Sequence, residues 1–423
     1  MVSRIRLRFV LAVLVFLMTV LGRMSLSVQA QDANVRATAT EWASDEPLRK
    51  GLPDRLTGVT DGAVSVADLA GDDRPDLVIT GTAGDRRGRP STVLYRNDGD
   101  DTFTAIDANI PNVAASATAT GDVNGDGDLD LLVAGKTARG RVAALYLGDG
   151  ASGFTTAGAA FPGVSGGSAS FGDVNGDEEL DLLLTGRRLS GGAGTPTARL
   201  YLGGGDGGFT RARAGLTGVS KSASALGDVN EDGNLDLLIT GSNADGVPTT
   251  TLYLGNGFGD FNKAGTDFEG LEQGSAALHD LNGDGNLDAL ITGLNAKKEP
   301  STRLYVGDGA GGFTAKTAGL PDVVDGSVSI GDVDADNHPD LVITGKNSAG
   351  TPIAALYLGD EGVRFSEARA ELEGVWGSAS LMADVDGDRR LDLLVTGENE
   401  RGEPTANLYF GDGDGSFEEA LIE

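Results

Sequence analysis

The sequence predicts an all-β protein, a seven-bladed β-propeller of four-stranded antiparallel blades. An acidic loop followed by an apolar run recurs seven times, with first residues Asp68, Asp122, Asp173, Asp228, Asp280, Asp332 and Asp384 and spacings of 51 to 55 residues. The chain's seven tyrosines recur with the same period, and a Phe follows each Tyr by eight residues. No part of the repeats keeps the period of 3.6 residues that is typical of a helix.

Four strands account for each repeat. Small and β-prone residues such as SVSIGD precede the acidic loop, and an apolar run such as LDLLLTG follows it. Such a continuous run is expected of a strand that is buried on both faces. A polar turn of variable length leads to a third strand such as TARLYLG, and a glycine-rich hairpin leads to the fourth. Units of this width favour a closed ring, with a solenoid as the alternative.

The N-terminus has the features of a secretory signal peptide over residues 1–30. Arg4, Arg6 and Arg8 form a basic region, residues 9–21 are apolar, and small residues precede a cleavage site after Ala30. A membrane anchor is the alternative, but the apolar stretch is short against the roughly 20 residues that a spanning helix needs. Residues 31–55 are predicted to be a linker or a closing strand, and residues 56–423 the propeller. How the ring closes stays open, because the segment after Phe417 already has the pattern of a fourth strand.

The composition limits the classes of partner. Without residues 1–30 the chain has 29 basic and 63 acidic residues, a formal charge of −34. This acidity argues against nucleic acid and anionic membranes as partners, and it fits cation binding or a saline habitat. The chain has no Cys, so a disulfide framework is excluded.

The acidic loops are predicted to bind Ca²⁺, which prefers oxygen ligands. Numbering each loop from its first Asp, positions 1, 3, 5 and 9 would offer side-chain oxygens and position 7 its backbone carbonyl. Gly at position 6 would permit the tight turn. Asx turns alone are the alternative explanation. Transition metals are not expected, since the chain has only two histidines and no cysteine.

Six or seven ions are expected, with the first site weakest because Ala70 occupies position 3. The predicted side-chain ligands are Asp68, Asp72 and Asp76; Asp122, Asn124, Asp126 and Asp130; Asp173, Asn175, Asp177 and Asp181; Asp228, Asn230, Asp232 and Asp236; Asp280, Asn282, Asp284 and Asp288; Asp332, Asp334, Asp336 and Asp340; and Asp384, Asp386, Asp388 and Asp392. The predicted carbonyl ligands are Asp128, Glu179, Asn234, Asn286, His338 and Arg390.

The pattern D-x-[DN]-x-D-G-x-x-D-L inside a repeat of this size resembles the FG-GAP/VCBS repeat of the integrin α-subunit propeller and of secreted bacterial proteins. The resemblance covers about residues 56 to 423. It implies that the calcium loops join the first and second strands on the lower face of the propeller. It also implies that partners bind the upper face, but it defines a function only loosely.

Catalytic signals are weak, and no enzyme is predicted. The residues Gly163 to Gly167 match G-x-S-x-G but lie in a loop between blades rather than at a strand-to-helix turn. The G-x-G-x-x-G matches from Gly203 and Gly307 lie in hairpins with no helix after them.

The variable turns carry a local excess of basic residues in an otherwise acidic chain. Soluble hairpin tips are one explanation, and a site for an anionic partner is the other. The candidate partner-binding residues are Arg86, Arg87, Arg89, Lys136, Arg139, Arg141, Arg187, Arg188 and Trp376, the last being the aromatic residue expected to be most exposed.

These features predict a monomeric, calcium-stabilised propeller that is secreted, to the extracellular space or the periplasm, and binds an extracellular protein or glycan without catalysis. A lectin with sugar sites between blades is one alternative. An accessory or catalytic propeller of a polysaccharide-degrading system is another, and a structural surface-layer component is a third.

Overall fold

The computed structural model describes residues 56–84, 88–99, 101–189 and 194–420, which form thirty β-strands and no helix. The predicted signal peptide, the segment 31–55, and Arg86 and Arg87 lie outside the described residues. Within the described part of the chain, nothing forms a helix that is long and apolar enough to cross a membrane. The all-β prediction is confirmed.

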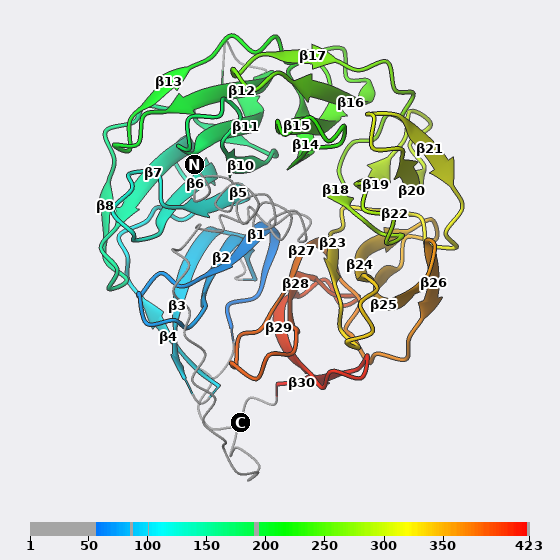
Figure 1. Cartoon of the computed structure of the whole chain (residues 1–423). Helices are drawn as coiled ribbons and strands as arrows, with labels where there is room; N and C mark the ends of the chain where they lie inside the picture. Colours follow the sequence, from blue (N-terminus) through cyan, green and yellow to red (C-terminus); the bar gives the residue numbers. More distant parts are fainter. Residues whose placement is uncertain (1–55, 85–87, 100, 190–193, 421–423) are drawn as a thin grey trace, which may run out of the picture.

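Four strands per repeat run from the centre of a ring to its rim (Figure 1). The innermost strands are β1 (Val59–Ala67), β5 (Ala114–Gly121), β9 (Val164–Ser165) with β10 (Ala169–Gly172), β14 (Ser220–Gly227), β18 (Ala276–His279), β22 (Val323–Val324) with β23 (Val328–Gly331), and β27 (Trp376–Ala383). The second strands are β2 (Asp76–Ala83), β6 (Asp130–Thr137), β11 (Asp181–Arg188), β15 (Asp236–Ser242), β19 (Asp288–Leu294), β24 (Asp340–Asn347) and β28 (Asp392–Glu398).

The outer strands complete each antiparallel sheet. The third strands are β3 (Pro90–Gly99), β7 (Gly140–Gly148), β12 (Thr195–Gly203), β16 (Pro248–Gly255), β20 (Pro300–Gly307), β25 (Pro352–Asp360) and β29 (Pro404–Gly411). The strands at the rim are β4 (Thr102–Ile106), β8 (Phe154–Thr156), β13 (Phe209–Arg211), β17 (Phe261–Lys263), β21 (Phe313–Lys316), β26 (Arg364–Glu367) and β30 (Phe417–Glu419).

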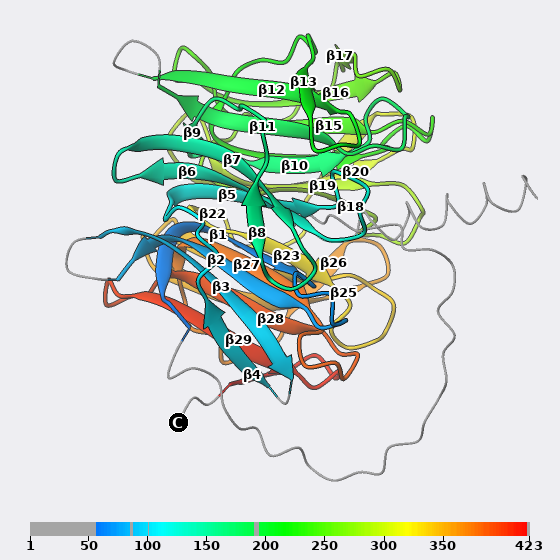
Figure 2. The same ribbon diagram turned by 90° about the vertical axis from the view of Figure 1, so that its left-hand side faces the viewer.

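Most sheets are built from one repeat in sequence order, as in β1-β2-β3-β4 and β14-β15-β16-β17. The second and third repeats share a nine-stranded sheet, because the short β9 pairs with both β7 and β11. Neighbouring sheets pack face to face around the ring (Figure 2). In this antiparallel order the acidic loops and the β3–β4-type hairpins lie at one end of the sheets. The variable turns and the linkers between repeats lie at the other end.

The second strand of every repeat is buried along its first six residues, as its continuous apolar sequence predicts. The innermost strands carry small hydroxyl side chains that pair between neighbouring repeats. Ser65 and Thr118 are 2.6 Å apart, and Thr185 and Ser222 are 2.8 Å apart. Short side chains allow these strands to approach near the axis, and their hydroxyls satisfy one another there.

The tyrosine of each repeat explains part of the repeat's fixed spacing. The Tyr253 hydroxyl accepts the backbone N–H of Thr217 at 3.0 Å, and the Tyr305 hydroxyl accepts that of Glu269 at 2.8 Å. Tyr95 and Tyr409 make the equivalent bond to the linkers that enter their repeats. In the other three repeats the donor position is proline, which has no N–H: Pro111, Pro162 and Pro321.

The ring closes by packing between the first and last repeats. One buried cluster joins Leu56, Val59 and Ile79 to Leu381 and Phe410. The last repeat has its own fourth strand, β30, as the sequence predicts, so no strand from the first repeat completes its sheet within the described residues. Trp42, a candidate closing residue in the sequence, lies outside them.

Candidate functional site

The acidic loops share one backbone shape. In each loop the N–H at position 6 donates to the carboxylate at position 1, at 2.7 to 3.0 Å. Positions 4 and 6 have left-handed φ values in all seven loops, whether they hold Gly, as at Gly125, or a residue such as Glu178, Ala335 or Arg389. The glycine pattern predicts the tight turn at position 6 but does not predict the left-handed conformation at position 4.

The Asp at position 9 is the most buried acidic group of each loop, with 0 to 2 % of its surface exposed. In the second loop, Asp130 accepts the N–H of Val123 at 2.8 Å and that of Gly148 at 2.9 Å. The other six loops repeat both bonds, so each of these carboxylates ties its loop to the third strand.

Burial shifts the acidity of these groups, since a buried carboxylate favours its neutral form. Burial raises the pKa of Asp76, Asp130, Asp181, Asp236 and Asp340 to about 6, and that of Asp288 and Asp392 to about 7. The neighbouring loop carboxylates raise the pKa further, whereas the two backbone hydrogen bonds oppose the rise. A cation among these oxygens would favour the charged form instead.

The loops differ in the oxygens that they bring together. Asp332, Asp334 and Asp340 each place an oxygen within 4.8 Å of the others, and so do Asp384, Asp386 and Asp388. Where position 3 is Asn, its amide oxygen accepts the N–H of position 5, and in three loops its amide nitrogen donates to the position-5 carboxylate. The first loop has Ala70 there and offers no side-chain oxygen at position 3.

The donor sets of the second to seventh loops fit a hard cation. Each has side-chain oxygens at positions 1, 3, 5 and 9, and no sulfur or imidazole nitrogen is needed to complete it. The internal hydrogen bonds also shape the loops, so the acidic residues combine a structural role with a ligand set that suits Ca²⁺.

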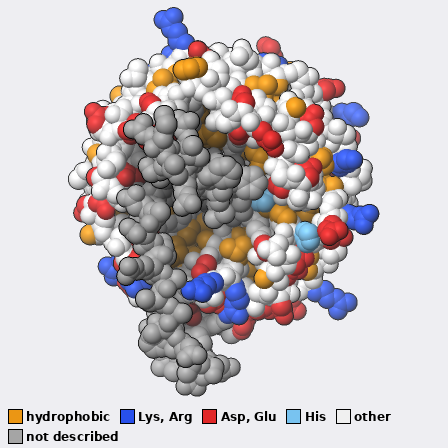
Figure 3. All heavy atoms as spheres, in the orientation of Figure 1, with side chains coloured by type: hydrophobic (Ala, Val, Ile, Leu, Met, Phe, Trp, Pro, Cys, Tyr) orange, Lys and Arg blue, Asp and Glu red, His pale blue; other side chains and the backbone are white. Residues whose placement is uncertain are grey.

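The basic candidates among the described residues lie at the opposite end, on or beside the variable turns. Arg89, Lys136 and Arg139 are exposed. Two of the remaining arginines are partly engaged: Arg141 donates to the Ser165 hydroxyl at 2.7 Å, and Arg187 donates to the Gly194 carbonyl at 3.3 Å. Seen along the axis, Asp and Glu side chains are scattered around the ring, and several Lys and Arg side chains project from its edge (Figure 3).

The expectation that Trp376 is the most exposed aromatic residue is wrong. Trp376 is only partly exposed, and the Lys346 ammonium lies 3.2 Å from the centre of its ring. This cation–π contact covers one face of the indole. Phe258, in the β16–β17 hairpin at the end of the acidic loops, is 80 % exposed.

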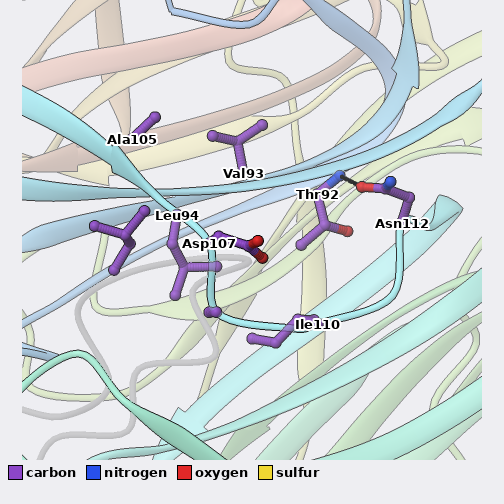
Figure 4. A pocket seen from close by; sticks show the side chains of 9 residues that line it. Thr92, Val93, Leu94, Ala105, Asp107, Ile110 and Asn112 are labelled. Atoms are coloured by element: carbon purple, nitrogen blue, oxygen red, sulfur yellow. Dashed lines mark hydrogen bonds between the residues drawn. The ribbon is translucent and has the colours of Figure 1, made fainter.

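Two hollows flank the first and second repeats. One of about 420 Å³ lies between β3, β4 and the following linker, where Val93, Leu94 and Ile110 provide apolar surface beside Asp107 (Figure 4). The Thr92 N–H donates to the Asn112 amide oxygen at 2.8 Å at one side of it. The other, of about 270 Å³, is lined by Asp61, Thr82, Lys136 and Thr137. Only Lys136 among these residues was a candidate from sequence. The smaller hollow forms between segments that are distant along the chain, whereas the larger one lies within residues 92–112, which carry no motif.

The fold and the loops together define a β-propeller with acidic inter-strand loops. Residues 68–133, 122–184, 228–291, 280–343 and 332–395 match the FG-GAP-like repeat, and all seven acidic loops fall within these segments. The chain belongs to the FG-GAP-like repeat family, as its loop motif suggests.

Among solved structures, the chain is similar to the BP39L lectin from Burkholderia pseudomallei. The TM-score is 0.56 with 11 % identity, over 86 % of this chain and 99 % of the lectin. The six-bladed β-propeller lectin of Aleuria aurantia has a TM-score of 0.41 and 10 % identity, over 74 % and 96 %. The β-fructofuranosidase from Schwanniomyces occidentalis has a TM-score of 0.32 and 11 % identity, over 88 % and 91 %. The neighbours thus include lectins and hydrolases, and no curated protein matches the sequence.

Proposed function

We propose that the protein is a secreted, calcium-stabilised, seven-bladed propeller that binds an anionic glycan or an acidic protein surface without catalysis. The proposal that the loops bind calcium is supported by the recurrence of one loop shape with converging oxygens. The binding role is supported by the exposed basic turns at the opposite end of an acidic ring. Each of the seven repeats supplies its own four strands, which supports the blade count.

Calcium would be held in the second to seventh loops by the side chains at positions 1, 3, 5 and 9 and by the carbonyl at position 7. In the second loop these ligands are Asp122, Asn124, Asp126, Asp130 and the carbonyl of Asp128. The bound ion supplies positive charge to a cluster of carboxylates next to buried strands. The chain's own backbone N–H groups orient the position-1 and position-9 carboxylates before the ion binds.

The anionic ligand would approach the turns of the first two repeats. Lys136 lines the hollow of about 270 Å³, and Arg89 and Arg139 are exposed on the same group of turns. Guanidinium groups bind carboxylate or sulfate through paired hydrogen bonds, and the hydroxyls of Thr82 and Thr137 suit a polyol. Acidic polysaccharides carry both carboxylate or sulfate groups and hydroxyl groups.

A lectin-like role at the larger hollow is the second candidate. Its surface combines apolar side chains with the polar groups of Asp107, Asn112 and Thr92, a mixture that suits a small polar ligand with apolar faces. The similarity in fold to the BP39L lectin is compatible with this candidate but carries no information about the ligand.

A glycan array with the mature chain tests the proposal. Selective binding of acidic glycans that is lost in the Lys136→Ala/Arg139→Ala double variant is expected. The Arg211→Ala/Lys263→Ala double variant is the control, since it removes the same charge from exposed positions on rim strands. Binding of neutral sugars that Asp107→Asn abolishes would favour the lectin-like site. Release of reducing ends from a bound polysaccharide would instead indicate a catalytic propeller.

A further inference from the structure

The first acidic loop keeps the shape of the other six although it lacks their donor set. Its position-6 N–H, on Asp73, donates to Asp68 at 2.8 Å, and the Asp72 N–H donates to Asp68 at 3.1 Å. Gly71 and Asp73 have the left-handed φ values of positions 4 and 6. Ala70 nevertheless removes the position-3 oxygen, so fewer oxygens remain to hold an ion.

A positive charge is already present in this loop. The Arg74 guanidinium, at position 7, forms an ion pair with the Asp72 carboxylate at position 5. Its Nε donates to the Asn97 carbonyl oxygen at 2.9 Å, which fixes the guanidinium between the loop and the end of β3. In the second loop, by contrast, the residue at position 7 is Asp128, which adds negative charge.

The seventh loop is the internal comparison. Arg390 occupies the same position 7 and also pairs with the position-5 carboxylate, Asp388. Here position 3 is Asp386, and three carboxylates converge. An arginine at position 7 is thus compatible with a complete set of oxygens in one loop and accompanies an incomplete set in the other.

We propose that the Arg74 guanidinium takes the place of calcium in the first loop, so that this loop is held without metal while the others bind it. This inference rests on the proposed calcium function. Asn97, which accepts the bond from Arg74, donates its side-chain amide to the Val385 carbonyl in the seventh loop at 2.7 Å. The metal-independent loop therefore lies at the seam where the ring closes.

Counting ions by native mass spectrometry of the mature chain in calcium tests the proposal. The Ala70→Asp/Arg74→Gln double variant, which restores the position-3 oxygen and removes the guanidinium, should bind one ion more than the wild type. Asp72→Asn should leave the wild-type count unchanged. An equal count in the wild type and the double variant, or the loss of one ion in Asp72→Asn, would overturn the proposal.

A thermal melt keeps the test decisive if the double variant fails to fold. Arg74→Gln should lower the Tm by about 1–2 °C, because the pair is partly exposed, and added calcium should not restore the loss. The matched variant Arg390→Gln should also have a lower Tm, but added calcium should restore the Tm of this variant, since its loop has a complete donor set. Equal restoration of both variants would contradict the proposal. A wild-type chain that binds no ion would refute the calcium function itself. The Tm of Arg74→Gln in chelator would then still show whether the arginine holds the first loop, and an unchanged Tm would contradict that role.

Discussion

The Asn97 side-chain amide donates a 2.7 Å hydrogen bond to the backbone carbonyl of Val385, 288 residues further along the chain. Asn97 is buried, and its own N–H donates to Asp76 as the glycines at this position do in the other repeats. The amide therefore adds a contact between the first and last repeats at the place where the ring closes without a covalent link.

Replacing Asn97 by Gly, the residue of the other six repeats, should destabilise the protein. The Val385 carbonyl would lose its partner in a buried seam, which costs about 1–3 kcal/mol. Chemical denaturation measures the change. Asn97→Asp, which keeps the size of the side chain but cannot donate to the Val385 carbonyl, should also destabilise the protein and separates the hydrogen bond from packing. A gain of stability in Asn97→Gly would mean that the seam bond is unimportant.

The tyrosine hydroxyls provide a matched pair of variants. Tyr305→Phe removes the acceptor of the Glu269 N–H and should cost about 1 kcal/mol. Tyr357→Phe should cost less, since Pro321 stands at the equivalent linker position and has no N–H to donate. Denaturation of both variants under one condition checks the difference. Equal losses of stability in the two variants would show that the hydrogen bond to the linker does not account for the role of the tyrosine.

Position 6 of the third loop carries strain that a glycine would relieve. Glu178 is exposed with a φ of 71°, a conformation that glycine adopts without steric penalty. Glu178→Gly should stabilise the protein by about 0.5–1 kcal/mol after the entropy of the unfolded chain is counted. Gly127→Ala, at the same position of the second loop with a φ of 93°, should destabilise it. The melting temperatures of the two variants should move in opposite directions.

The repeats and their strands were predictable because each follows from local pattern. The continuous apolar run after every acidic loop predicts a strand buried on both faces, and the fixed Tyr–Phe spacing predicts the hairpin. The features that the sequence did not reveal join residues distant along the chain. Asn97 differs from its equivalents in the sequence, but its partner Val385 becomes apparent only when the ring is closed. Likewise, Lys346 covers Trp376 from another strand, so the indole's exposure could not be judged from sequence.

Thermal unfolding in calcium and in EDTA measures whether calcium neutralises the acidic loops and thereby stabilises the fold. An ion present at 100 times its Kd stabilises the folded state by about 2.7 kcal/mol for each site. With several sites, the Tm is expected to fall by at least about 5 °C in EDTA and to return when calcium is added in excess. A Tm that is the same in calcium and in EDTA would show that calcium does not stabilise the acidic loops.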